Sequence, residues 1–433
     1  MSRSTLPETA APAPGAPPSS GSAKALLPIF LIVLVDVFGM TLVIPLLAIY
    51  AESLHATPFQ AAMLISVFAA CQLVSGPLLG SLSDRFGRKP LLLISQVGTF
   101  LGFVLMARAD ALWMVYVARI IDGATAGNLS IAQAYISDHS APSQRTRSFA
   151  LIGIAFGLGF FIGPFVTSLL VKHGLAAPIY LAAGLSLLSI LCTLVLLPGG
   201  KPATQSSAAS SGDVGPGGKR LSVLQWGAYA EFFRRPVLAG LLLQFFFYAF
   251  CFSTFTSGFS LFAERTFTWE GHPFTPREIG FLFAYTGVLG ILLQGGLISR
   301  LVKRLGEPVL VAAGFVSITA GYVALGLVKT VPLLVVVATI SSFGNGVLRP
   351  TLSSLLSQNA QRHEQGIILG LSQSLTAVAA IFAPMVAGAL INRGLLMQWA
   401  WVAGVSGILG LLWSRFGSAR AQHAGLQRDA QTR

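Results

Sequence analysis

The sequence predicts an all-α membrane protein with about twelve spanning helices, arranged as two sets of six. The first observation is composition: 54% of the 433 residues are hydrophobic and 10% are charged, whereas a soluble domain keeps roughly a quarter of its residues charged. The second is that apolar segments of about 20 residues, the length that crosses a bilayer, recur along the chain. The third is their continuity, because a membrane β-barrel would need short alternating segments instead.

Twelve apolar runs give the expected spans in chain order. The first half supplies 27–50, 59–81, 90–107, 112–135, 148–171 and 178–197. The second half supplies 237–262, 278–298, 307–328, 331–357, 366–391 and 398–414. The two sets of six echo each other: glycines, serine and charge follow span two (Gly80, Ser83, Asp84) and span eight (Gly296, Ser299, Arg300). Such internal repeats are typical of transporters whose site opens alternately to each side.

The distribution of basic residues predicts the orientation in the membrane. The formal net charge is +13, and Lys and Arg collect in alternate loops and in the segment after the last span. By the positive-inside rule these loops and both termini are cytoplasmic. We therefore expect a multi-pass protein of the cell (inner) membrane that contacts anionic lipid, and no nucleic-acid partner.

Composition also predicts five segments. Residues 1–24, rich in Ala, Pro and Ser, should be a disordered cytoplasmic tail. Two six-helix bundles, 25–198 and 237–415, should be joined by the Gly- and Ser-rich cytoplasmic linker 199–236, which ends in a short interfacial helix. Residues 416–433 should form a second cytoplasmic tail.

The sequence carries no pattern of an enzyme or a metal protein. The three cysteines fall inside spans, the six histidines fall outside them, and we find no phosphate-binding loop or metal-ligand cluster. We therefore expect no enzymatic activity, no cofactor and no metal, and a monomer whose partners are a small-molecule substrate, protons and the lipid bilayer.

A dense cluster of charges follows the second span, in the stretch GSLSDRFGRKP. Gly80 and Gly87 lack a Cβ, so two helix ends can approach closely there. The Asp84 carboxylate can accept hydrogen bonds from a neighbouring helix N-terminus, whose dipole favours negative charge. Arg85 and Arg88 should hold the loop in the cytosol. This predicts a gating loop, although topology-setting charge alone would explain the cations.

Two carboxylates lie deep inside predicted spans. Asp36 is about nine residues into span one, roughly 13 Å along the helix axis, and Asp122 is about ten residues into span four from the opposite side. A charge near the bilayer midplane costs about 3 kcal/mol, so it usually faces a cavity and has a role. Arg119 is three residues from Asp122 and can pair with it. We predict a proton-coupling group of these three residues, in which either carboxylate could carry the proton and the pair could instead be purely structural.

Other polar side chains could line a substrate path. Arg349, inside span ten, either snorkels to the cytoplasmic surface or lines the cavity. The aromatic pair Tyr248 and Phe252, one turn apart in span seven, is expected to face the cavity. The remaining candidates could equally hold helices together; they are Gln72, Asn128, Gln244, Gln294, Asn345 and Gln373.

Four stretches resemble the major facilitator superfamily, and within it the twelve-helix drug:proton antiporters related to tetracycline efflux pumps. GSLSDRFGR matches the superfamily's loop signature, VDVFGMTLVIPLL (35–47) resembles helix one of the tetracycline pumps, and VARIIDG (117–123) carries the helix-four arginine. GIAFGLGFFIGP (153–164) is similar to the antiporters' helix-five signature. The antiporter glycine motif would then consist of Gly153, Gly157, Gly159, Gly163 and Pro164.

The resemblance implies the major facilitator fold and places the partner of Asp84 at helix eleven, where the contact would clasp the two bundles at their cytoplasmic ends. It also exposes departures. Tetracycline pumps carry further acids in helices three and nine and a histidine in helix eight, where this chain has Gly102, Ile318 and Gly290. Asp36 has the family position, whereas Asp122 is this chain's own addition. The chain is also similar to animal tetracycline-transporter-like proteins, which the resemblance associates with organic anions.

We therefore expect a secondary active transporter that exports amphipathic small molecules or drugs in exchange for protons, by alternating access. One alternative is a uniporter or symporter of an organic anion or metabolite, which the loss of the extra acids keeps open. A second is a receptor or scaffold that kept the fold without transport.

Overall fold

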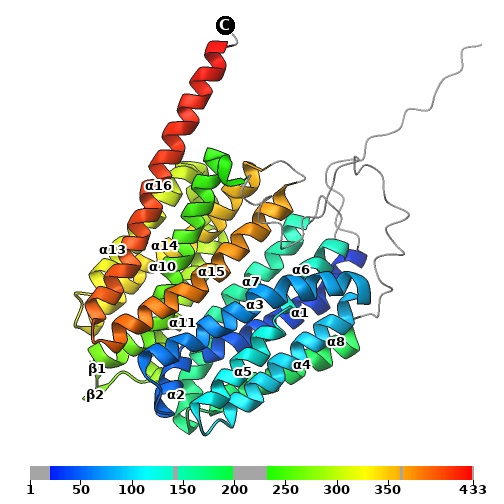
Figure 1. Cartoon of the computed structure of the whole chain (residues 1–433), viewed down its shortest axis with the longest axis vertical. Coiled ribbons are helices and arrows are strands. Elements are labelled where there is room, and N and C mark those ends of the chain that lie inside the picture. Colours follow the sequence, from blue (N-terminus) through cyan, green and yellow to red (C-terminus); the bar gives the residue numbers. More distant parts are fainter. Residues whose placement is uncertain (1–19, 140–144, 198–231, 361–363, 432–433) are drawn as a thin grey trace, which may run out of the picture.

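A computed structural model describes residues 20–139, 145–197, 232–360 and 364–431, which are almost entirely helical. The helices of the first half are α1 (Ser20–Val43), α2 (Leu47–Ser53), α3 (Pro58–Phe86), α4 (Arg88–Ala107), α5 (Leu112–Ala124), α6 (Asn128–His139), α7 (Arg145–Leu170), η1 (Val171–His173) and α8 (Ala177–Leu196). The elements of the second half are α10 (Pro236–Thr266), β1 (Thr268–Trp269), β2 (His272–Pro273), α11 (Pro276–Leu292), η4 (Leu293–Leu297), α12 (Ile298–Leu305), α13 (Glu307–Leu325), α14 (Val331–Gln358), α15 (Gln365–Asn392) and α16 (Leu396–Gln431). Figure 1 shows the two halves as separate groups of helices that lie side by side.

The prediction of an all-α membrane protein is confirmed. Among the described residues, ten helices are long and apolar enough to cross a membrane, and the bent pair Leu27–Val43 with Leu47–Ser53 adds an eleventh. The remaining predicted span, 112–135, corresponds to α5 and α6, which are 13 and 12 residues long and each too short to cross alone. All twelve predicted spans therefore fall on helices.

Three spans that we predicted as continuous are interrupted. Span one bends by 47° between α1 and α2, where Pro45 has no N–H to continue the helical hydrogen bonds. Span eight passes through the π-helical turn η4, in which Gly296 has φ 141°. Span four stops at Ala124 and restarts at Asn128.

The break in span four is held by side chains of neighbouring helices. The Ser95 hydroxyl of α4 donates to the Thr125 carbonyl and accepts from the Gly127 N–H at 2.9 Å. Ser75 of α3 donates to the Gly123 carbonyl at 2.6 Å. Backbone groups that a broken helix frees inside a membrane must find such partners, so α3 and α4 stabilise the interruption.

The predicted gating loop is mostly helix. α3 continues five residues beyond the predicted end of span two, so Gly80, Asp84 and Arg85 lie in its last turns, and Arg88 is the first residue of α4. Gly87 alone connects the two helices, with φ +96°, a backbone conformation that favours glycine. The expected close approach at Gly80 is absent, since a Cβ there would have its nearest neighbour, Ser130 Cβ, at 4.0 Å.

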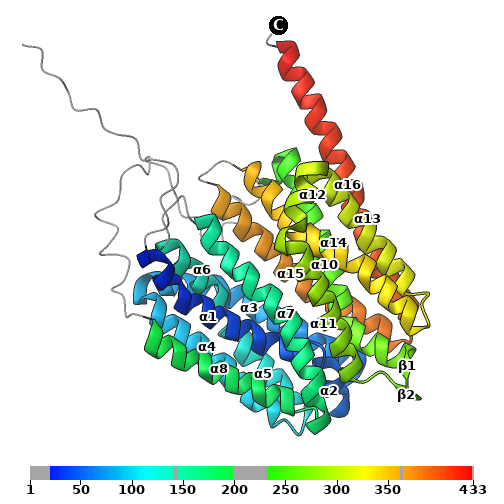
Figure 2. The same ribbon diagram turned by 180° about the vertical axis from the view of Figure 1, so that it is seen from behind.

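The predicted tails also differ from the structure. α1 begins at Ser20, inside the segment 1–24, and α16 runs to Gln431, through most of the segment 416–433. Figures 1 and 2 show the last turns of α16 projecting beyond the helix bundle. Residues 198–231 lie outside the described part of the chain, and with them most of the predicted linker and its interfacial helix. A short antiparallel hairpin, β1–β2, was not predicted.

The two halves meet along two helix pairs, α3 with α15 (Figure 1) and α7 with α11 (Figure 2). We call the end of the molecule that holds α2 and the β1–β2 hairpin the far end, and the end where α16 emerges the terminal end. At the far end Ser66 donates to the Ile381 carbonyl at 2.7 Å, and a Cβ on Gly388 would lie 2.7 Å from Ala62. Toward the terminal end, a Cβ on Gly290 or Gly370 would meet no atom within 4 Å.

The hydrophobic core repeats this asymmetry. One buried cluster spans both halves at the far end and includes Leu46 and Phe103 from the first and Phe262 and Trp399 from the second. At the terminal end each half has its own cluster, around Leu92 in the first and around Leu352 in the second. The bundles are therefore joined at the far end and diverge toward the terminal end.

Candidate functional site

The Asp36 carboxylate lies inside the first bundle, on α1. Its Oδ2 atom is buried and has no hydrogen-bond partner among the described residues. The polar side chains that interact with this carboxylate are those of Ser189 on α8, Asn128 on α6 and Asp122 on α5. A buried carboxylate oxygen without a partner is costly in its ionised form.

Arg119 and Asp122 form the ion pair expected from their spacing. The Nη2 atom of Arg119 lies 2.9 Å from Oδ2 of Asp122, and the two side chains are 10% and 9% exposed. Thr99 of α4 donates a hydrogen bond of 2.8 Å to the other carboxylate oxygen. The guanidinium carbon lies 5.3 Å from the ring centre of Phe68 and 6.0 Å from that of Phe103, so aromatic faces help to keep the charge inside the bundle.

Small residues let neighbouring helices close around this pair. A Cβ on Gly102 of α4 would lie 3.2 Å from the Cβ of Asp122, and one on Gly123 would lie 2.7 Å from the Phe68 carbonyl. Gly102 of α4 thus faces Asp122 directly. The carboxylate of α5 thus occupies the space beside a missing side chain on α4.

Two polar residues of this centre, Thr99 and Ser189, escaped the sequence prediction of the site. Thr99 binds Asp122, Ser189 lies beside Asp36, and Gln96 donates from Nε2 to the Ser189 hydroxyl at 2.7 Å. Gln96 and Thr99 are three residues apart and therefore share one face of α4. That spacing, next to the predicted ionisable group, is the signal that could have found Thr99.

The second bundle has a buried polar centre without carboxylates. Tyr248 donates weakly to the Asn345 carbonyl at 3.5 Å, and the Asn345 amide donates to the Tyr322 hydroxyl at 3.0 Å. Phe252 stacks on Tyr248, with ring centres 6.2 Å apart. Cys251 is completely buried nearby. Tyr322 and Cys251 were not predicted as part of a site.

Arg349 points from α14 toward the first bundle. Its guanidinium carbon lies 5.9 Å from the ring centre of Phe156 on α7, and the residue is exposed. Within the described residues it has no carboxylate partner. Of the two alternatives for Arg349, this geometry favours a place between the bundles over snorkelling to the surface.

The other predicted substrate-path residues are scattered. Gln244 is buried in the second bundle, and Asn128 has a buried Oδ1 atom without a partner in the described structure. Gln72, Gln294 and Gln373 are exposed on α3, η4 and α15. No hydrogen bond within the described part of the chain joins these five side chains to one another.

The charged run at the α3–α4 junction is tied together by its own side chains. Arg88 pairs with Asp84 at 2.7 Å, where the Asp84 side chain is 42% exposed, and it also donates to the Ser83 hydroxyl at 2.6 Å. Lys89 donates to the carbonyls of Leu194 and Leu197, at 2.8 and 2.7 Å. It thereby caps the C-terminal end of α8, where cations are stabilised.

The glycine motif of α7 is divided between two surroundings. A Cβ on Gly159 or Gly163 would lie 2.4 Å from Val37 or 2.1 Å from Thr41, so these glycines allow α7 to pack on α1. Gly157 has only Ile291 nearby, at 3.8 Å, and Gly153 has nothing within 4 Å. Pro164, inside α7, has its carbonyl 2.6 Å from where a Cβ on Gly280 of α11 would be.

A second, partly buried ion pair was missed by the sequence analysis. Arg235, at the start of α10, donates two hydrogen bonds of 2.8 Å to the two carboxylate oxygens of Glu364, just before α15. Such bidentate pairs are the strong ones. The pair fixes the beginning of α15, the helix toward which the resemblance directs Asp84.

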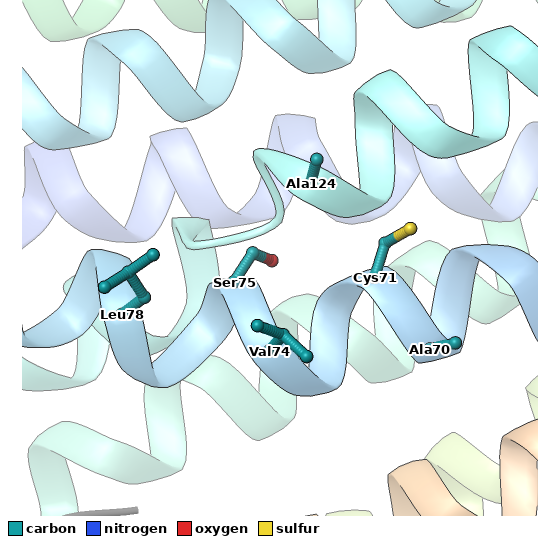
Figure 3. Close-up of a pocket in the computed structure, with 6 residues that line it drawn as sticks. All are labelled: Ala70, Cys71, Val74, Ser75, Leu78 and Ala124. Carbon is teal, nitrogen blue, oxygen red and sulfur yellow. The ribbon is translucent and has the colours of Figure 1, made fainter.

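The structure also contains an apolar pocket of about 500 Å³, between α3 and the break in span four. Figure 3 shows its lining residues, which are Ala70, Cys71, Val74, Ser75, Leu78 and Ala124. The one hydroxyl, that of Ser75, already donates to the Gly123 carbonyl. This pocket holds none of the predicted ionisable groups and offers only apolar contact.

Known proteins resemble this chain over most of its length. The sequence profile of the Major Facilitator Superfamily matches residues 29–371 and 273–421. The class B tetracycline resistance protein of Escherichia coli is 28% identical over 87% of this chain and 91% of its own length. Multidrug resistance protein 2 of Bacillus subtilis is 26% identical over 84% of this chain and 89% of its own. The crystal structure of the human organic anion transporter MFSD10 (TETRAN) superposes with a TM-score of 0.66 at 22% identity, over 92% of this chain and 100% of that one.

Proposed function

This chain belongs to the major facilitator superfamily, and from that premise we propose that it exports amphipathic small molecules or drugs in exchange for protons. The curated relatives in bacteria are named for tetracycline resistance and multidrug resistance, which supports efflux. Membership in a transporter family also supports a transport role rather than an enzymatic one.

The observation that carries the proposal is the arrangement of Asp36 beside the Arg119–Asp122 pair. The group contains two carboxylates and one guanidinium, which pairs with Asp122, so it bears one uncompensated negative charge when both carboxylates are ionised. Removing such a charge from water is expensive, and one bound proton neutralises the group. Asp36, whose buried Oδ2 has no partner in the described structure, is the site that we assign to this proton. Arg119 holds Asp122 ionised and tunes the group.

Alternating access follows from the way the bundles meet. The shared core closes the far end, whereas the bundles diverge at the terminal end. Transport requires the opposite form, in which the far end opens and the terminal end closes. In that form the Asp84 carboxylate, at the end of α3, would turn from its partner Arg88 to the beginning of α15, with Arg85 and Gly80 on the approaching surface.

We further propose that this multi-pass membrane protein lies in the inner membrane as a monomer with both termini in the cytoplasm. The terminal end, which carries the basic α3–α4 junction, would then face the cytosol. The two six-helix bundles would be residues 25–198 and 237–415, as the sequence suggests. The described form would be inward-open, ready to take substrate from the cytosol or the inner leaflet.

One observation favours a second candidate function, the transport of an organic anion by uniport or symport. Arg349 has no carboxylate partner among the described residues and lies against Phe156 of the other bundle, and a solved structure of similar fold is an organic anion transporter. The variant Arg349→Glu should then reverse the preference between acidic and basic substrates, and Arg300→Glu, on the exposed surface of α12, is the matched control.

The decisive experiment uses purified protein in proteoliposomes with an imposed pH gradient. Three probes cover the candidates: a tetracycline, a lipophilic cationic dye and an aromatic carboxylate. Efflux coupled to protons predicts that Asp36→Asn lowers gradient-driven transport at least tenfold, about 1.4 kcal/mol, but leaves exchange without a gradient intact. Asp110→Asn, in an exposed loop, should behave like the natural protein. Gradient-independent transport of the carboxylate alone would favour the second candidate, and no transport of any probe would contradict both.

A further inference from the structure

The two bundles are joined at the far end by polar contacts that α10 makes with α2 and with the turn before it. Arg265, near the end of α10, pairs with Glu52 of α2 at 2.7 Å, and the side chains are 34% and 22% exposed. Five residues earlier on α10, Ser260 donates a buried hydrogen bond of 2.9 Å to the Pro45 carbonyl. Both contacts run from one bundle to the other, so both must break if the far end opens.

The interruption of span one makes the inner contact possible. Residues 44–46 form the turn between α1 and α2, so the Pro45 carbonyl is not committed to a regular helix and can accept from another element. The same bend directs α2 toward α10, which brings Glu52 to Arg265. A straight span one would leave the C-terminal part of this helix elsewhere and would supply neither contact.

A third charged residue adjoins this pair. Glu264 precedes Arg265 on α10, and its carboxylate interacts electrostatically with both Glu52 and Arg265. Its buried Oε2 atom has no hydrogen-bond partner in the described structure. Glu264 and Arg265 are adjacent on the helix and do not face each other, and Arg265 is the residue that contacts Glu52 directly. Glu264 therefore mainly repels Glu52 across the interface.

We propose that Glu52 and Arg265 form an electrostatic lock that holds the far end closed, and that Glu264 weakens this lock by repulsion. The closed far end is the form described, and the lock is a contact that only this form can make. Opposing terms keep the lock breakable, since Arg265 pulls α2 toward α10 and Glu264 pushes it away. The inference rests on the alternating access required by the proposed function, but it can be measured without any transport.

The test is the population of the open far end in purified full-length protein in lipid nanodiscs. Spin labels are placed at Asp110 and Lys329, which are exposed on far-end loops of different bundles, after Cys71, Cys192 and Cys251 are replaced by alanine. Pulsed electron resonance then gives the distribution of distances between the labels. Arg277→Gln removes an exposed far-end arginine without touching the lock and is the matched control.

Glu52→Gln and Arg265→Gln should each raise the ratio of open to closed far ends by about two- to fivefold, as expected for a partly exposed ion pair. The charge exchange Glu52→Arg with Arg265→Glu should restore part of the closed population, and Glu264→Gln should lower the open population below that of the natural protein. Arg277→Gln should change nothing.

An unchanged distance distribution in Glu52→Gln and Arg265→Gln would overturn the lock. The lock would also be overturned if the exchanged variant is folded, as measured by circular dichroism, but does not regain any of the closed population. A rise instead of a fall in Glu264→Gln would refute the repulsive role of Glu264. If the distances respond as expected but no probe is transported under a pH gradient, the lock stands and the proposed function fails. If transport is coupled to the pH gradient but the distances do not respond, the proposed function stands and the lock fails.

Discussion

The two bundles place polar groups at corresponding positions but use different chemistry there. In the first bundle the first, third and fourth spans contribute Asp36, Thr99 and the Arg119–Asp122 pair. In the second bundle the corresponding spans, α10, α13 and α14, contribute Tyr248, Tyr322 and Asn345. The centre of the first bundle contains two carboxylates and a guanidinium, whereas the centre of the second consists of hydroxyl groups, aromatic rings and an amide.

We interpret the difference as a division of labour within a repeated architecture, in which the proposed proton coupling belongs to the first bundle. If both centres titrated, each cycle would move charges in both halves, and the charge on one would disturb the other through a region of low dielectric constant. With the carboxylates of the polar centres confined to the first bundle, the centre of the second bundle would be left to recognise substrate by rings and amides. The predictions below test this division, and the largest effects are expected where charge is involved.

The largest effect should follow from breaking the ion pair of the first bundle. Arg119→Leu leaves the Asp122 carboxylate buried without its cation, and losing one partner of a buried pair costs about 3–5 kcal/mol. Replacing both residues, as Arg119→Leu with Asp122→Leu, should recover most of that stability, because no buried charge remains. The free energy of unfolding in detergent micelles measures both. Equal destabilisation by the single and double variants would mean that the pair matters for its shape and not its charge.

A smaller effect is expected where helices approach at glycines in each bundle. A Cβ on Gly321 of α13 would lie 2.8 Å from the Ser341 Cβ, and one on Gly102 of α4 would lie 3.1 Å from the Ala118 carbonyl. Overpacking of this kind typically costs about 1–3 kcal/mol. Gly321→Ala should therefore lower the thermal unfolding temperature without altering proton coupling. Gly102→Ala should also displace Asp122, so the ratio of gradient-driven to passive transport should fall in this variant. If Gly321→Ala lowers that ratio equally, the division of labour is wrong.

The smallest effect concerns hydrogen bonds in the second bundle. Asn345→Leu removes the amide that donates to Tyr322, and such bonds inside membranes average about 0.6 kcal/mol. Half-saturating substrate concentrations should change in transport assays, while the dependence of the rate on the pH gradient stays that of the natural protein. Tyr322→Phe removes the accepting hydroxyl and should behave alike. A loss of gradient dependence in either variant would place coupling in both bundles.

Hydrophobicity predicted the helices well, because each span must cover a fixed thickness of hydrocarbon, and the i, i+3 spacing predicted the Arg119–Asp122 pair. The interruptions escaped, since the groups that make them tolerable come from other helices. Ser95 binds backbone groups that are 30 and 32 positions away, and no local pattern contains that information. The expected loop after span two is helical instead, because a single glycine at positive φ, Gly87, is enough to turn the chain between α3 and α4.

The candidate site was only partly predictable. Depth in a span singled out Asp36, but its neighbours Ser189 and Asn128 lie on helices far along the chain. Arg349 had two equally acceptable interpretations until Phe156 of the other bundle appeared beside it. Arg235 and Glu364 are 129 residues apart in the sequence, and Glu52 and Arg265 are 213 residues apart. Long-range pairings of this kind depend on how helices are placed in space.

The shared hydrophobic cluster at the far end has a thermal consequence. To open that end, the molecule must split one apolar core in two, whereas closing the terminal end joins surfaces that already belong to separate clusters. Exposing apolar surface to water raises the heat capacity, so the inward- and outward-facing forms should differ in this property. The balance between them should then follow a curved van 't Hoff plot, and a carrier tuned for one growth temperature would rest in a different form when cooled.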